Sequence, residues 1–129
     1  KVWLCGADMG ATYLLPRIVG LGHASELLFF GDTIDAARAE QIGLVNRIVT
    51  DGEEAVRLAV EWANKLAQGP AFAHAMTKQM LESEVAMTLG AAIEAEAQAQ
   101  ALCMQHPDFA EAHAAFKEQR APRFKGAPE

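Results

Sequence analysis

The sequence has 129 residues, which is enough for one domain with a single hydrophobic core. Its formal net charge of -6 argues against nucleic-acid binding, and no apolar run approaches the ~18 residues that cross a bilayer. Cys5 and Cys103 lie far apart in apolar stretches without a metal-binding spacing, which favours free thiols in a reducing compartment. We therefore expect a cytoplasmic protein with no metal ion and neither nucleic acid nor membrane as a partner.

The first segment predicts a strand, a tight turn and the start of a helix. Residues 2–5 form a continuous apolar run typical of a buried strand. Gly6 and Gly10 flank the turn, and Asp8 lies between them. A carboxylate in this position has two interpretations of about equal weight. It caps the exposed N–H groups of the following helix, or it takes part in chemistry.

Glycines and a proline divide the next part of the chain into short helices. Residues 11–18 are expected to form one helix that Pro16 bends or ends, and residues 23–30 a second one. Asp35 suits the N-cap of a third helix over residues 36–42. Residues 44–50 have strand composition and predict a short strand.

The remainder predicts helices alone. Acidic residues in the first turn, a Gly-Pro break and a His-Pro-Asp turn separate four of them before an irregular tail. The expected ranges are a helix from residue 53, then 71–84, 88–104, and a last helix from 107 or 108 through 120.

Catalytic motifs cannot be assembled from most of the chain. The sequence holds no phosphate-binding loop, dinucleotide glycine pattern or Ser/His/Asp arrangement. Glu94 and Glu96 are two residues apart on a helix and point to different sides, so they do not form a carboxylate pair. Asp8 is the strongest candidate for chemistry.

Four segments in order resemble the crotonase (enoyl-CoA hydratase/isomerase) superfamily. The C-terminal stretch from Glu111 to Phe124 is also similar to the last helix of that family. The four segments are GADMG at 6–10, LPRIVG at 15–20, ASELLFFGDTIDA at 24–36 and AEQIGLVNRIV at 39–49.

The resemblance implies a crotonase-like α/β fold, a β-β-α spiral, of which this chain supplies the C-terminal half. Residues 1–50 would end the core spiral and carry the Asp8 turn, and residues 51–129 would form a helical trimerisation or lid region. This chain would then be mainly helical, with one or two short strands. The family's other half carries the oxyanion hole and most of the CoA site, so we expect the isolated chain to be inactive.

The resemblance also implies site residues. Simple hydratases have glycine at the position of Asp8, whereas an aspartate there resembles the dienoyl-CoA isomerase and aryl-CoA dehalogenase branches. Phe116 matches a family position that contacts CoA. Gln119 stands where hydratases have lysine, and Arg120 is the nearby substitute for it. The expected substrate is an acyl-CoA thioester with no further cofactor, and the expected assembly is a homotrimer or hexamer.

A second hypothesis comes from another class of protein. The alanine-rich helices after residue 53 suit close helix packing, as in a non-catalytic module that oligomerises with or complements other chains.

Overall fold

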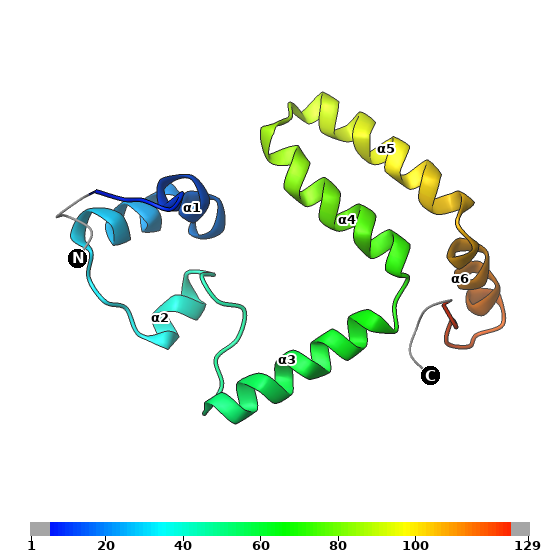
Figure 1. Cartoon of the computed structure of the whole chain (residues 1–129), viewed down its shortest axis with the longest axis horizontal. Coiled ribbons are helices and arrows are strands. Elements are labelled where there is room, and N and C mark those ends of the chain that lie inside the picture. The colour runs from blue at the N-terminus through cyan, green and yellow to red at the C-terminus, as the bar shows by residue number, and fades with distance from the viewer. Residues whose placement is uncertain (1–5, 125–129) are drawn as a thin grey trace. The chain divides into compact units, whose positions relative to one another are not determined.

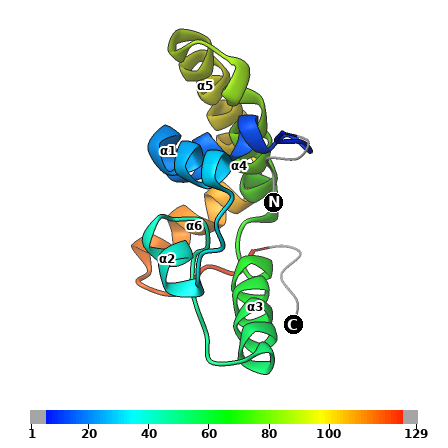
Figure 2. The ribbon, with the colours of Figure 1, turned by 90° about the vertical axis from the view of Figure 1, so that its left-hand side faces the viewer.

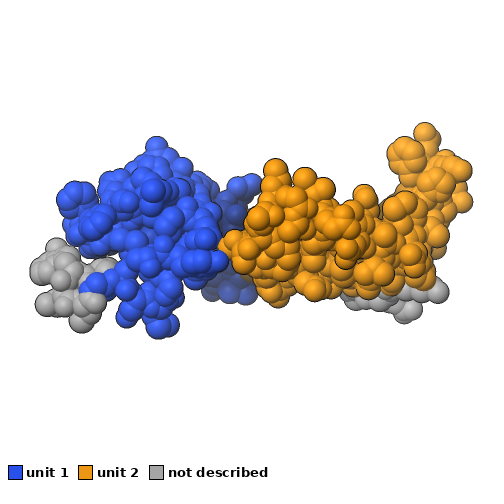
Figure 3. Space-filling model, turned by 90° about the horizontal axis from the view of Figure 1, so that it is seen from above, with its two compact units in different colours: residues 1–56 blue, residues 57–129 orange. Residues whose placement is uncertain are grey.

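The structure, a computed structural model, describes residues 6–124, and these are mostly helical (Figure 1). They form two compact units, Lys1–Val56 and Arg57–Glu129 (Figure 3). The elements in order are α1 (Ala11–Phe30), α2 (Ala36–Gln41), α3 (Gly52–Ala67), α4 (Ala71–Ser83), a 3-10 turn η2 (Glu84–Ala86), α5 (Leu89–Gln105) and α6 (Pro107–Lys117).

Helix α1 consists of two helical segments joined at Gly20. This glycine has φ 80° and ψ 158°, which interrupts the helix in the region where the sequence predicts a break. Pro16 lies inside the first segment rather than at its end. The second segment ends at Gly31, whose left-handed backbone and N–H bond to the Leu27 carbonyl form a helix C-cap.

A small apolar cluster holds α1 against α2. Val19, Ala24 and Ile42 are buried together in it. The Asp35 carboxylate caps α2 by accepting the Arg38 N–H at 2.7 Å, which confirms the predicted cap. Partly buried side chains that surround the cluster are Leu15, Leu27 and Ile34.

The predicted strand over residues 44–50 is not found, and residues 6–124 as a whole contain no strand. The N–H groups of Leu44 and Val45 both bond to the Ala39 carbonyl, at 2.8 and 3.4 Å. The backbone donors that a strand would offer to a neighbour therefore satisfy the end of α2 instead. The other predicted strand, residues 2–5, lies outside the described residues.

Helix α3 is well capped but has an exposed apolar face. The Asp51 carboxylate accepts the Glu54 N–H at 2.8 Å, and the Glu54 carboxylate accepts the Thr50 N–H at 3.0 Å. No residue of α3 is buried. Val56, Val60 and Leu66, which share one face at helical spacing, are 65%, 52% and 61% exposed.

Helices α4 and α5 form a hairpin, and α6 packs on α5; the hairpin is visible in both ribbon views (Figures 1 and 2). Ala99 and Ala115 are buried. Their small side chains allow the packed helices to approach closely. The prediction that the last helix reaches Arg120 is wrong, since α6 ends at Lys117. Gln119 turns the chain with φ 53°, and the Arg120 N–H bonds back to the Ala115 carbonyl at 3.0 Å.

Candidate functional site

Asp8 begins a tight turn that leads into α1. Its carbonyl accepts the Ala11 N–H at 2.9 Å, and the two residues between them, Met9 and Gly10, both have positive φ (53° and 80°). This is the arrangement of a type I′ turn, which needs left-handed backbone at both central positions. Gly10 is at the second central position, where glycine is favoured, whereas the first central position is occupied by Met9.

The Asp8 carboxylate does not cap α1. The N-cap residue is Gly10, and no side chain supplies a cap bond there. Within the described span, no hydrogen bond or ion pair reaches the exposed Asp8 carboxylate. Of the two sequence interpretations of Asp8, the structure therefore rules out the helix cap.

An apolar pocket of about 430 Å³ lies next to the Asp8 turn. Gly6 and Ala7, the two residues that precede Asp8, form one wall of it. The other walls come from both segments of α1, on either side of the Gly20 kink. They include Pro16, Leu21, Ala24, Ser25, Leu28 and Phe29. The kink thus helps to shape a pocket whose wall includes Gly6 and Ala7, whereas Asp8 is not among its lining residues.

Phe116 and Arg120, the predicted CoA-binding residues, differ in their surroundings. The Phe116 side chain is 82% exposed on α6 and is free to contact a ligand. Arg120 already binds two carboxylates: its Nη1 lies 2.6 Å from Glu111 Oε1, and its Nε lies 2.6 Å from Glu118 Oε2. A phosphate that binds Arg120 would have to compete with both acids.

Glu111 is the centre of this network and was missed as a partner of Arg120 by sequence reasoning. It also accepts the Arg123 N–H at 2.7 Å. The hydrogen bond from the Arg120 side chain is the main cause that lowers the pKa of Glu111 to about 2, with the Arg123 N–H second. Arg120 and Arg123 lie beyond the end of α6. Glu111 and Arg120 are nine residues apart in the sequence, and this spacing did not indicate that they form a pair.

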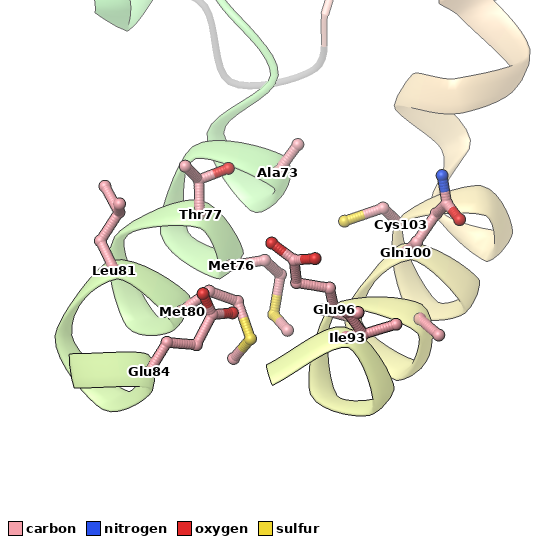
Figure 4. Close-up of a pocket in the computed structure, with 12 residues that line it drawn as sticks. Ala73, Met76, Thr77, Met80, Leu81, Glu84, Ile93, Glu96, Gln100 and Cys103 are labelled. Atoms are coloured by element: carbon pink, nitrogen blue, oxygen red, sulfur yellow. The ribbon is translucent and has the colours of Figure 1, made fainter. Parts of the chain in front are cut away.

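A second groove, of about 610 Å³, runs between α4 and α5 (Figure 4). Met76 and Met80 line it from α4, and Glu84 and Glu96 bring two carboxylates to it from different elements. One Glu84 oxygen is buried without a hydrogen-bond partner among the described residues. The sequence predicted no role for this groove, and its acids could not be paired because they belong to separate segments.

Metal-binding clusters and membrane-spanning helices were also searched for in the described part of the chain. Residues 6–124 contain no cluster of three His, Cys, Asp or Glu side chains placed to hold a metal ion. No helix within the same span is long and apolar enough to cross a membrane.

Comparison with known proteins identifies the family. The sequence profile of the enoyl-CoA hydratase/isomerase family matches residues 5–127. The chain belongs to this family. A 1,2-epoxyphenylacetyl-CoA isomerase from Escherichia coli is 33% identical over 119 residues, which are 92% of this chain and 45% of that protein. The human mitochondrial methylglutaconyl-CoA hydratase is 36% identical over 91% of this chain and 35% of its own length.

Solved structures of the family have the same fold. A Streptomyces coelicolor A3(2) protein described as a putative enoyl-CoA hydratase matches with a TM-score of 0.87 and 52% identity. It covers 93% of this chain, which in turn covers 43% of that structure. The chain thus matches part of the crotonase fold and spans less than half the length of these relatives.

Proposed function

We propose that this chain is part of an acyl-CoA-processing enzyme in which Asp8 transfers a proton next to the CoA thioester. The observation that carries the proposal is the exposed Asp8 carboxylate, which caps no helix. The two residues that precede Asp8 in the sequence, Gly6 and Ala7, line an apolar pocket. A carboxylate held in a defined turn, with an apolar pocket beside it for an acyl group, suits general acid/base catalysis. The names of the relatives, an acyl-CoA isomerase and acyl-CoA hydratases, support this class of substrate.

The proposed reaction also needs groups that stabilise the enolate, and we assign these groups to the part of the relatives that this chain does not cover. Proton removal beside a thioester leaves an enolate, whose oxygen needs preorganised N–H donors. We assign these donors to the part of the relatives that lies outside the matched region, and we therefore expect the chain by itself to be inactive. The proposed enzyme needs no cofactor besides the CoA of its substrate, and we place it in the cytoplasm.

The test is Asp8→Asn in the full-length protein, with enoyl-CoA and dienoyl-CoA esters as substrates. Loss of the carboxylate should lower kcat by at least about 10²-fold, as for other general acids and bases. The thermal midpoint should stay unchanged, because Asp8 caps no helix. Asp32→Asn, an exposed aspartate between α1 and α2, is the matched control. A kcat unchanged by Asp8→Asn would overturn the proposal.

For CoA binding we propose Phe116 and Arg120. Phe116→Ala gives the clearer test, since the Phe116 side chain is exposed while Arg120 also binds Glu111 and Glu118. We expect Phe116→Ala to raise KM for the CoA ester while kcat changes little, as removal of uniform binding does. An unchanged KM would remove Phe116 from the site.

The exposed apolar face of α3 supports assembly, and we propose a homotrimer or hexamer. Val56, Val60 and Leu66 place apolar area in solvent that a second copy would cover. Sedimentation of the full-length protein tests this, and Val60→Lys should dissociate the assembly. A stable assembly with no acyl-CoA turnover would instead favour the alternative, a non-catalytic helical module.

A further inference from the structure

A polar contact joins α1 to α2 next to their small apolar cluster. It is made by His23, in the second segment of α1, and Arg38, on α2. The Arg38 Nη2 lies 3.3 Å from the His23 Nδ1, although the two residues are 15 positions apart in the sequence. Ala24 and Ser25, which directly follow His23, line the pocket next to the Asp8 turn.

This contact requires a neutral His23 ring. An arginine guanidinium donates hydrogen bonds and accepts none, so His23 Nδ1 must be the acceptor. An imidazole nitrogen accepts only when it carries no hydrogen, and in the charged ring both nitrogens carry one. The observed arrangement therefore belongs to uncharged His23, with its hydrogen on Nε2.

Glu26 lies close to both partners. Its Oε2 is 3.9 Å from His23 Nδ1 and 3.7 Å from Arg38 Nη2. Within residues 6–124, Glu26 from the same helix and Arg38 from α2 are the charged groups that contact His23. On the other side of Arg38, the uncharged Gln41 accepts a hydrogen bond from Nη1 at 2.9 Å.

Protonation of His23 changes these interactions. The His23 side chain is 44% exposed, so the proton comes from solvent. A hydrogen on Nδ1 removes the acceptor that Arg38 uses and places two cations in contact. The same hydrogen gives the ring a donor for Glu26, which lies on the same face of α1 at i,i+3 spacing. An interaction within α1 thus replaces one between α1 and α2.

We propose that His23 is a pH-sensitive switch, which holds Arg38 and therefore α2 when its ring is neutral and releases them when it is protonated. Histidine changes charge between about pH 5 and pH 8, and the switch operates in this range. Helix α2 has only 6 residues, so the loss of one contact weakens it measurably. The switch does not involve the proton transfer proposed for Asp8.

Hydrogen exchange of the Ile42 N–H measures the release, because this group closes the end of α2 by bonding to the Arg38 carbonyl at 3.1 Å. NMR of the 129-residue chain at about pH 5 and pH 8 gives its protection factor, from which the intrinsic pH dependence of exchange is removed. The protection factor should be about fivefold higher at the upper pH, which is the equilibrium effect of one hydrogen bond.

Two substitutions of His23 imitate the two states of the switch. His23→Gln keeps an acceptor oxygen for Arg38 but cannot be protonated in this range, so protection should stay high at both pH values. His23→Arg carries a permanent charge, so protection should be low at both. His113→Gln, which replaces an exposed histidine on α6, is the matched control and should keep the wild-type pH dependence.

A variant of the donor gives a second, independent test. Arg38→Met removes the guanidinium but keeps a long side chain, and it should abolish the pH dependence of Ile42 protection even if the His23 variants lose helicity. Circular dichroism checks the helicity of each variant. An equal protection factor at both pH values in the wild type would overturn the proposal. A wild-type pH dependence that persists in His23→Gln or in Arg38→Met would overturn it as well.

Discussion

The Glu111 carboxylate binds the Arg120 guanidinium through both oxygens, Oε1 to Nη1 at 2.6 Å and Oε2 to Nη2 at 3.2 Å. The same Oε1 accepts the Arg123 N–H at 2.7 Å. One side chain on α6 therefore fixes two points of the tail. Phe124, the residue after Arg123, lines a pocket of about 150 Å³ together with Phe72 and Phe109.

Glu111→Gln should release this part of the tail. The amide keeps one acceptor oxygen but loses the charge and the bidentate pair with Arg120. We expect faster hydrogen exchange of the Arg123 N–H. Glu118→Gln is the matched control, since Glu118 also accepts a hydrogen bond from the Arg120 side chain, whereas the Arg123 backbone N–H bonds to Glu111. Equal exchange in the two variants would contradict the role given to Glu111.

The stabilising effect of Glu111 should depend on pH. Its pKa in the folded chain is lowered to about 2, mainly by the Arg120 hydrogen bond, from an ordinary value of 4.5. A group with a lowered folded pKa stabilises fully above its unfolded pKa, and the effect disappears as the pH falls toward the folded pKa. The difference in thermal midpoint between wild type and Glu111→Gln should therefore shrink between pH 4.5 and about 2. A difference that stays constant over this range would argue against the ion pair.

Gln119 occupies a position where glycine is preferred. It follows the end of α6 with φ 53°, and the Arg120 N–H closes the motif on the Ala115 carbonyl. A β-carbon in left-handed backbone is costly, so Gln119→Gly should stabilise the chain by about 1 kcal/mol. Urea denaturation gives the measurement. Gln119→Ala keeps the β-carbon and should bring no gain.

Local signals in the sequence predicted most of the helices correctly. Capping residues and glycines act over a few positions, so Asp35, Gly31 and the Gly69-Pro70 break could be placed without knowledge of the fold. The prediction of a strand at residues 44–50 was wrong because it, too, used only local signals. Its composition was right for a strand, but pairing depends on a distant partner, and here the N–H groups of Leu44 and Val45 turn back to Ala39.

The candidate site was predictable only in part. The position of Asp8 between Gly6 and Gly10 made it a candidate, and the motif resemblance added a catalytic role. Whether its side chain caps α1 depended on backbone angles at Met9 and Gly10 that composition does not reveal. The Glu111–Arg120 ion pair and the groove that Glu84 and Glu96 both line combine separate segments of the chain, so they required the packed structure. The helix that begins near residue 53 was predicted, while the exposure of its apolar side chains was not.

Asp35→Ala should weaken α2. The Asp35 carboxylate accepts the Arg38 N–H at 2.7 Å, and this is the side-chain cap of a helix of only 6 residues. Loss of an N-cap acceptor costs about 1 kcal/mol. Asp35→Asn retains an acceptor oxygen and should lose less. The free energy of unfolding from urea titration measures both, and equal losses would show that charge rather than capping is important.

Ile42→Ala tests the small core that positions α1 and therefore the pocket beside Asp8. Ile42 is 8% exposed and packs with Val19 and Ala24. Truncation of a buried isoleucine costs about 2–4 kcal/mol through lost transfer energy and the cavity left behind. Leu14→Ala is the matched control on α1, since Leu14 is 53% exposed and should change stability by less than about 0.5 kcal/mol. Because the α1 kink shapes the pocket, Ile42→Ala should also lower turnover in the full-length protein, while Leu14→Ala leaves it unchanged. Equal effects of the two variants on the free energy of unfolding would show that the Val19–Ala24–Ile42 cluster does not hold α1 in place.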